Sequence, residues 1–387
     1  MTNILYLLLM FTSAVATTTV EQTIQMVWQG MVERNPGDFL IHRPYSETPG
    51  DAVSEGVGYG LIMAMYCNDQ EHFDMLLDGA EVTMWNGQCY NWRVDRNGWV
   101  TGSGGATDAE QDIAAMLIMA KHRVDRGEWI DYRNGFYEQR ARTILGSLWQ
   151  QGITADGTLR PGYYWGGEKL VNVGYFAPAW YRIFARFDTS HDWMSVVDRS
   201  YEILQRSPGY EDGLVPDWMT PYGAYTNDLG YNAYGNGHYM YKDAIRVLWR
   251  IGTDYYWNQD ERAKDYMMNA YNFMTEKGGI GGANFYQMDG SLVPEGDVWV
   301  FDGGAKTRPR REHSPLTIGM WSIPMMLMGD LNEQESATEE LLKYHQENAT
   351  YWGLDEGGED VEHNEMYFEQ FLASFGALFM TDLFQPY

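Results

Sequence analysis

Basic residues are scarce in this chain of 387 residues. Lys and Arg together number 27 against 54 for Asp and Glu, which gives a formal net charge of −27. Proteins that bind a phosphate backbone or an anionic membrane surface need a basic face. The charge therefore argues against a nucleic-acid or membrane partner and favours a neutral or cationic substrate.

Cysteine is also nearly absent, since Cys67 and Cys89 are the only two in the chain. In an oxidising compartment they could form a disulfide, which would stabilise the fold by about 3 kcal/mol in the loop-entropy account. Two free, buried thiols are the alternative, because a sequence does not show how far apart the two residues lie.

The signatures of several enzyme classes are missing as well. The chain contains no HExxH, CxxC or P-loop motif, and its eight His show no metal-ligand spacing. Its Gly-Gly pairs lack the strand-to-helix context that a phosphate-binding loop requires. We therefore expect no cofactor and no metal, with a carboxylate site for Ca²⁺ as the alternative.

Long apolar runs are lacking except near the N-terminus. The run from Ile4 to Phe11 is far shorter than the ~20 residues of a membrane helix. Ala14-Val15-Ala16 has the form of a signal-peptidase site, although no Lys or Arg precedes the run. We expect a signal peptide over residues 1–16, a secreted or periplasmic protein and one domain over residues 17–387; an internal helix or anchor is the alternative.

Helical periodicity is what the chain does contain. Five apolar residues follow the i, i+3, i+4, i+7, i+8 spacing of one helical face: Ile24, Val27, Trp28, Met31 and Val32. Similar stretches bring the expected total to about twelve helices, separated by long loops rich in glycine and aromatic residues. A short β-ribbon is expected at 91–100, around the Asn97-Gly98 turn. This count fits a toroid of paired helices, and an irregular helical bundle fits it almost equally well.

Two acidic segments stand in unusual surroundings. Glu55 lies in SEGVGYG, where Ser54 can cap a helix and three alternate glycines would let a ligand approach the backbone. The simpler explanation of Glu55 is that its negative charge interacts favourably with the dipole of the helix that follows. Asp108 and Asp112 lie at i, i+4 on one helical face, where two carboxylates repel each other unless one is bonded.

Asp243 is the third acidic candidate. It precedes Arg246 by three residues, so an exposed ion pair on a helix surface is the simpler interpretation. The aromatic residues and glycines between Tyr222 and Tyr241 favour a lined cavity leading to it instead.

Five segments, in this order and spacing, together resemble glycoside hydrolase family 8: SEGVGYG, ATDAEQDIA, YWGGEKLVNVGYFAPAWYRIFA, GLVPDW and YKDAIRVLWRIGTDYYW. The resemblance runs from about residue 35 to 385 and is closest to the bacterial endoglucanase branch. It implies an all-α fold, the (α/α)₆ barrel of six helical hairpins, with long loops that form an open substrate groove. It also implies a glycoside hydrolase catalytic domain that inverts the configuration of its product.

The resemblance implies a role for each matching residue. Glu55 matches the general acid, Asp243 the general base, and Asp108 the aspartate that holds the sugar at the point of cleavage. The expected substrate-binding residues are Trp92, Trp165, Tyr175, Arg246 and Tyr59. An inverting pair needs a separation of roughly 6.5–9.5 Å, so we expect that spacing between Glu55 and Asp243.

Two features of these residues bear on the chemistry. The first turn of a helix favours an ionised Glu55, whereas a general acid must carry a proton; Asp108 nearby would favour the protonated form. Lys242 stands where close relatives have Tyr, and its ammonium would lower the pKa of Asp243 and compete for its hydrogen bonds. Glu110, where relatives have Asp, is expected to change packing only.

The expected function is endo-acting hydrolysis of β-1,4-glucosidic bonds in cellulose or related β-glucans by a monomer, with the polysaccharide as its only partner. A chitosanase or xylanase of the same family is one alternative, and a non-catalytic glycan-binding protein is the other.

Overall fold

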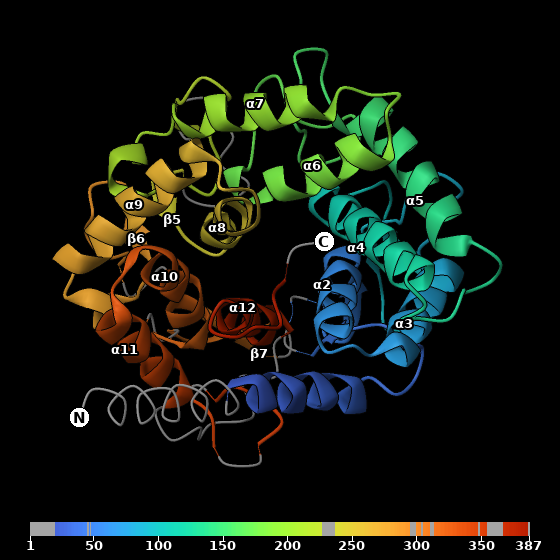
Figure 1. Cartoon of the computed structure of the whole chain (residues 1–387), viewed down its shortest axis with the longest axis horizontal. Helices are drawn as coiled ribbons and strands as arrows, with labels where there is room; N and C mark the ends of the chain where they lie inside the picture. The colour runs from blue at the N-terminus through green and yellow to red at the C-terminus, as the bar shows by residue number, and fades with distance from the viewer. Residues whose placement is uncertain are drawn as a thin grey trace, which may run out of the picture.

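Six helices form an inner ring in the computed structural model, which describes residues 20–44, 46, 48–226, 237–294, 299–302, 305–309, 313–346, 349–353 and 367–385. The inner helices are α2 (Ser54–Tyr66), α4 (Thr107–Asp125), α6 (Pro178–Phe187), α8 (Arg246–Asn258), α10 (Pro315–Met328) and α12 (Tyr367–Leu378). Each packs against the next, and α12 packs against α2 to close the ring (Figure 1).

A second ring of helices surrounds the first. It comprises a helical stretch over residues 20–34, α3 (Gln70–Thr83), α5 (Phe136–Ser147), α7 (Trp193–Leu204), α9 (Glu261–Glu276) and α11 (Leu331–Leu342). Each outer helix from α3 to α11 packs on the inner helix that precedes it in the chain (Figure 1). The fold is therefore the (α/α)₆ barrel that the resemblance implied.

Burial follows from this two-layer arrangement. Inner helices bury most of their residues, and α2 buries every residue except Glu55. Outer helices bury a single stripe, which in α11 consists of Ala337 and Leu341. Glycines let inner helices approach closely: a Cβ on Gly376 of α12 would overlap the backbone of Gly319 on α10.

The three glycines of SEGVGYG serve this packing as well. A Cβ on Gly58 would lie 2.9 Å from the Cβ of Asp112, one on Gly60 would overlap Leu76, and Gly56 is similarly close to Ile41. The prediction that these glycines let a ligand approach the backbone is therefore wrong. They let α2 pack against α3, α4 and the chain around residue 41.

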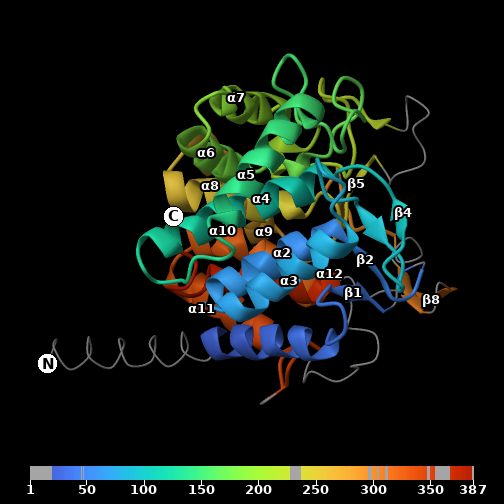
Figure 2. The same ribbon diagram turned by 90° about the vertical axis from the view of Figure 1, so that its right-hand side faces the viewer.

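Short strands gather at one end of the barrel, as Figure 2 shows. The antiparallel sheet β1-β2-β3-β4 comprises β1 (His42–Arg43), β2 (Asp51–Val53), β3 (Arg93–Val94) and β4 (Val100–Gly102). The turn between β3 and β4 contains Gly98 at φ 79°, which confirms the predicted ribbon. Two further pairs are β5 (Tyr239–Met240) with β6 (Tyr286–Gln287), and β7 (Trp299–Asp302) with β8 (Ala305–Pro309). Because β2 runs directly into α2, this end of the barrel holds the first turn of α2.

The two cysteines are free thiols, so the possible Cys67–Cys89 disulfide is not formed. Cys67 caps the C-terminal end of α2, whereas Cys89 lies close enough to Glu110, in the first turn of α4, to be affected by its charge. The first turns of α2 and α4 meet at the same end of the barrel, and α2, with its 13 residues, is about 20 Å long. Cys67 and Cys89 therefore lie near opposite ends of α2. Burial raises the pKa of Cys67 to about 12 and that of Cys89 to about 11, so neither thiol is ionised at neutral pH.

The predicted signal peptide over residues 1–16 lies outside the described residues. Among the described helices, none combines the length and the apolar character that a membrane span requires.

Candidate active site

The guanidinium of Arg246 is the centre of the site. Arg246 begins α8, and its side chain is completely buried. Its Nη1 donates hydrogen bonds to Glu55 Oε2 and, at 3.1 Å, to Asp108 Oδ2, while its Nη2 donates to Asp243 Oδ1 at 2.6 Å. The three acids selected from the sequence, which lie on α2, α4 and the turn before α8, therefore meet on one cation.

The three carboxyl groups lie at different depths. The side chain of Asp243 is 36% exposed, that of Glu55 is 15% exposed and that of Asp108 only 2%. Asp243 therefore faces solvent, whereas Asp108 lies at the bottom of the cluster. Because one guanidinium binds both Glu55 and Asp243, their nearest oxygens lie within about 8 Å, the reach of two hydrogen bonds across its terminal nitrogens.

A second acid–base pair lies one helical turn deeper. Arg250 donates to both oxygens of Asp112, with an Nη2–Oδ2 distance of 2.8 Å, and Trp180 Nε1 donates to Asp112 Oδ1 at 2.8 Å. Asp108 and Asp112, four residues apart on α4, are thus matched by Arg246 and Arg250, four residues apart on α8. The two carboxyl groups are tolerated on one face because each bonds to a guanidinium, Asp112 to Arg250 and Asp108 to the shared Arg246.

Protonation within the cluster follows from burial. Burial, together with the charge of Glu55, raises the pKa of Asp108 to about 8. Asp108 also hydrogen-bonds to Glu55, and its own buried carboxyl group holds a proton at neutral pH. The expected proximity of the two acids is confirmed, and burial favours the protonated form of Asp108.

Lys242 lowers the pKa of Asp243, as predicted, but its effect is weak. Burial raises the pKa of Asp243 despite the lowering effects of Arg246 and, more weakly, of Lys242. The Lys242 ammonium lies 3.6 Å from the carboxylate of Glu369 on α12. Since desolvation of Asp243 is the largest effect, its pKa is raised overall and Lys242 offsets only part of the rise.

Tyr59 and Tyr175 contact Arg246 from different sides. Tyr59 OH is 3.2 Å from Arg246 Nη1, but its ring is completely buried and packs edge-on against Phe375 and Trp249. It therefore supports the guanidinium and lines no surface, contrary to the predicted substrate contact. Tyr175 is half-buried, with its ring centre 4.8 Å from the Arg246 guanidinium carbon.

Of the aromatic residues expected to bind substrate, Trp92 and Trp165 reach the surface, and they are 39% and 41% exposed. Trp92 precedes β3, and its carbonyl accepts the backbone N–H of Ser54, next to Glu55. Trp165 contacts Trp218 edge-on at 5.7 Å, and Trp218 in turn lies 6.2 Å from Tyr175. A continuous series of rings thus leads from the surface to Arg246.

Three contributors to the site were missed in the sequence. Tyr367, at the start of α12, donates its O–H to Glu55 Oε1 across a separation of 312 residues. Asp217 accepts the backbone N–H groups of Tyr241 and Ala244, each at 2.9 Å, and so shapes the turn that carries Asp243. Asp217 and Trp218 belong to the quoted GLVPDW segment, but nothing in that segment indicated their contacts. No local pattern marks Tyr367.

Among the residues with described positions, no group of three or more His, Cys, Asp or Glu could hold a metal ion.

Comparison with known proteins gives consistent matches. The family model described as "Glycosyl hydrolases family 8" matches residues 33–289. Endoglucanase 2 of Ruminiclostridium josui is 36% identical over 261 residues, and Endoglucanase C of Ruminiclostridium cellulolyticum is 34% identical over 261 residues; each alignment covers 66% of this chain and 54% of the relative. The chain therefore spans about half the length of the curated endoglucanases that it matches.

Solved structures match the fold over nearly its whole length. The crystal structure of a reducing-end-xylose releasing exo-oligoxylanase superposes with a TM-score of 0.71 at 18% identity and covers 95% of this chain and 94% of that chain. At this identity the match supports the barrel fold only.

Proposed function

Because the chain belongs to glycosyl hydrolase family 8, we propose that it hydrolyses internal β-1,4-glucosidic bonds of cellulose or related β-glucans with inversion of configuration. The observation that supports this most strongly is the meeting of three carboxyl groups on Arg246. We assign Glu55 as the general acid, Asp243 as the general base, and Asp108 as the group that positions the sugar and holds the proton that Glu55 will transfer.

The acid is supplied by the pair of Glu55 and Asp108. An inverting hydrolase needs one protonated and one ionised carboxyl group on opposite faces of the sugar. Asp108 holds a proton up to about pH 8, because burial raises its pKa to that value, and it hydrogen-bonds to Glu55. Glu55 is the more exposed member, so it is the one that can reach the glycosidic oxygen. As substrate excludes water, the proton passes from Asp108 to Glu55 and from Glu55 to the leaving group.

The base is Asp243 in its ionised form. Arg246 Nη2 donates to Asp243 Oδ1, and the exposed part of the carboxylate faces solvent. A water held there can attack the anomeric carbon while Asp243 accepts its proton. The limit of about 8 Å between Glu55 and Asp243 is compatible with the spacing of an inverting pair.

Recognition of the polymer rests on the exposed aromatic rings. Trp92 and Trp165 stand on the same end of the barrel as the acids, and flat rings of this kind stack against the apolar faces of sugars. The relatives named endoglucanases, at 34–36% identity, favour a β-1,4-glucan. Xylan is the second candidate, because a reducing end xylose-releasing exo-oligoxylanase of Halalkalibacterium halodurans also matches in sequence, at 24% identity over 265 residues.

The experiment follows the anomeric signals of the first products by ¹H NMR, with a soluble cello-oligosaccharide as substrate. We expect the α-anomer first, and Glu55→Gln and Asp243→Asn to lower kcat by about 10²–10⁴-fold. Glu335→Gln on the exposed face of α11 is the matched control and should retain full activity. First appearance of the β-anomer would refute both assignments.

The substrate is tested by measuring reducing sugar released from carboxymethyl-cellulose, xylan and chitosan in parallel. The proposal requires the β-glucan to be cut fastest. A faster reaction on xylan or chitosan would assign that specificity instead, and binding without any product would identify a glycan-binding protein.

A further inference from the structure

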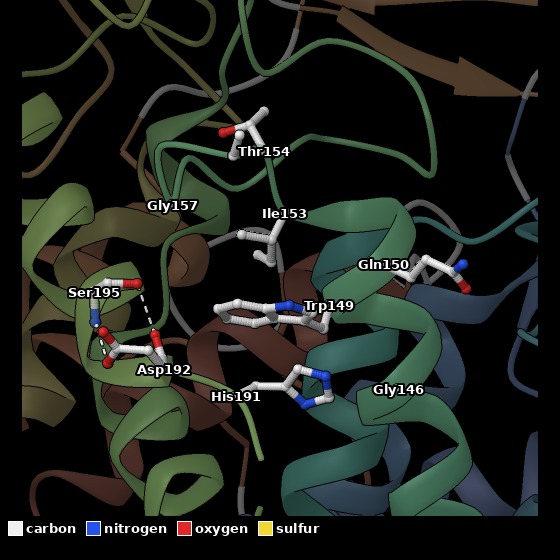
Figure 3. A pocket seen from close by; sticks show the side chains of 10 residues that line it. Gly146, Trp149, Gln150, Ile153, Thr154, Gly157, His191, Asp192 and Ser195 are labelled. Carbon is white, nitrogen blue, oxygen red and sulfur yellow. Dashed lines mark hydrogen bonds between the residues drawn. The ribbon is translucent and has the colours of Figure 1, made fainter. Parts of the chain in front are cut away.

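A cavity of about 640 Å³ lies in the outer layer, between the C-terminal end of α5 and the N-terminal end of α7 (Figure 3). Its walls include Trp149, Gln150, Thr154 and Asp192. The volume falls within the range of about 300–1,000 Å³ that is typical of small-molecule sites. None of its lining residues belongs to the carboxyl cluster, whose residues lie on or beside inner helices.

Local backbone geometry marks this wall as unusual. Helix α5 passes directly into a π-helical turn over Leu148–Gly152, and Trp149 belongs to that turn. Such turns are rare and occur frequently at functional sites. The following residues form the opposite rim, where Gly157 adopts a left-handed φ of 81° beside the backbone of Ser195.

The Trp149 ring is held in a fixed orientation. Its ring centre lies 4.9 Å from that of His191, and Trp193 packs edge-on against it at 5.3 Å. Asp188 fixes both neighbours, because its Oδ2 lies 2.6 Å from His191 Nδ1 and accepts the Trp193 Nε1–H at 3.0 Å. In Figure 3 the indole is seen nearly edge-on, with His191 on one side and Ile153 and Thr154 beyond the other.

Polar groups without partners among the described residues line the same cavity. Within the described part of the chain, neither Trp149 Nε1 nor the side-chain amide of Gln150 makes a hydrogen bond. Asp192 accepts the Ser195 N–H through Oδ1 at 3.2 Å and thereby caps α7, while its Oδ2 has no protein donor among the described residues. These groups can therefore donate to or accept from a ligand.

The composition of the walls selects the class of ligand. No Lys or Arg lines the cavity and Asp192 carries a negative charge, so an anionic ligand is disfavoured. A purely apolar ligand is also disfavoured, because it would remove water from the polar groups around the rim and offer them no hydrogen bonds in return. A neutral ligand with one apolar face and many hydroxyl groups satisfies both conditions.

We propose that this cavity is a second glycan-binding site, in which one sugar ring stacks on Trp149 while its hydroxyl groups bond to Gln150 and Asp192. The choice of a β-1,4-glucan as its ligand rests on the proposed function. The site holds the polymer without cleaving it, so two attachment points raise the affinity for a long chain above that for a short one.

The experiment measures depletion of protein by regenerated amorphous cellulose, insoluble xylan and insoluble chitosan, in a Glu55→Gln background that leaves the polymer intact. Trp149→Ala removes the stacking surface. Gly146→Leu fills the mouth of the cavity from α5, where an added Cβ meets nothing within 4 Å, and replacing a helical glycine does not weaken the helix. Ser336→Leu adds the same side chain to exposed α11 as the matched control.

We expect Trp149→Ala and Gly146→Leu each to weaken binding to one of the three polymers by about three- to tenfold. This is the loss of affinity expected when the contact between one sugar and one aromatic ring is removed. With Glu55 restored, both variants should retain wild-type kcat/KM on a short cello-oligosaccharide, which occupies the catalytic site alone. Binding of both variants equal to that of Ser336→Leu on all three polymers would overturn the second site. Absence of hydrolysis by the wild-type chain would refute the proposed function instead, while the binding comparison would still decide the second site.

Discussion

Glu110 offers a sharp test of the electrostatic reasoning, because it is a buried acid that bonds to no guanidinium among the described residues. It lies in the first turn of α4, completely buried, where its Oε1 accepts the Tyr90 N–H at 2.7 Å and the Tyr163 O–H is 3.4 Å from its Oε2. Burial raises its pKa to about 8. The folded protein therefore holds a proton on Glu110 at neutral pH, and the unfolded chain does not.

The consequence for stability has a definite sign. The folded-state pKa of Glu110 exceeds the unfolded value of 4.5, so its stabilising contribution is fully present below pH 4.5 and is lost as the pH rises to about 8. Within that window each pH unit lowers the free energy of unfolding by about 1.4 kcal/mol. Glu110→Gln has the shape of the protonated acid and removes this dependence. The variant should gain roughly 4 kcal/mol relative to wild type between pH 5 and pH 8.

The assay is urea denaturation followed by tryptophan fluorescence at pH 5, 6, 7 and 8. Asp108 produces a similar slope in both proteins, since its pKa is also raised to about 8, so only the difference between variant and wild type is informative. Glu335→Gln, on an exposed helix face, is the control and should leave the wild-type slope unchanged. A Glu110→Gln difference that stays constant across this pH range would refute the reasoning.

Two further predictions concern the arginine–carboxyl pairs. Asp108→Asn removes the group that holds a proton up to about pH 8, so the alkaline limb of the kcat/KM profile should move to lower pH by at least about one unit; an unmoved limb would show that Asp108 does not supply the acid. Arg246→Lys and Arg250→Lys form a matched pair, because one ammonium cannot bridge the groups that each guanidinium binds. The first should lower kcat by about 100-fold or more, whereas the second should lower the free energy of unfolding by about 3 kcal/mol through its pair with Asp112 and leave kcat of the folded enzyme within a few-fold. Equal losses of kcat in both would contradict the division between the two pairs.

Much of the architecture could be predicted from the chain alone. Apolar residues at helical spacing indicated the helices, and the ordered segments of the resemblance distinguished a barrel from an irregular bundle. The β3–β4 ribbon was predictable because Asn97-Gly98 favours the left-handed backbone that Gly98 adopts. The helices and the ribbon follow from local preferences of the chain, and the barrel follows from the order of the matching segments.

One local explanation proved wrong and another incomplete, for the same reason. The glycines of SEGVGYG indicated an exposed backbone, but Gly58 is required by Asp112, more than fifty residues away in sequence. Lys242 lowers the pKa of the adjacent Asp243 as expected, yet its ammonium also faces Glu369 on α12, and burial raises the pKa of Asp243 overall. In both cases a neighbour in space, supplied by another helix, decided the role of the residue.

The sequence by itself determined which acids belong to the site, because Glu55, Asp108 and Asp243 each stand in a recognisable segment. Only the tertiary structure decided how they share charge and protons, since burial and the single guanidinium of Arg246 exist only after α2, α4 and α8 have packed. The same holds for Tyr367, which reaches Glu55 only because α12 closes the ring against α2. A proton's preference depends on solvent exclusion and on charges a few ångströms away, and the order of residues along a chain specifies neither.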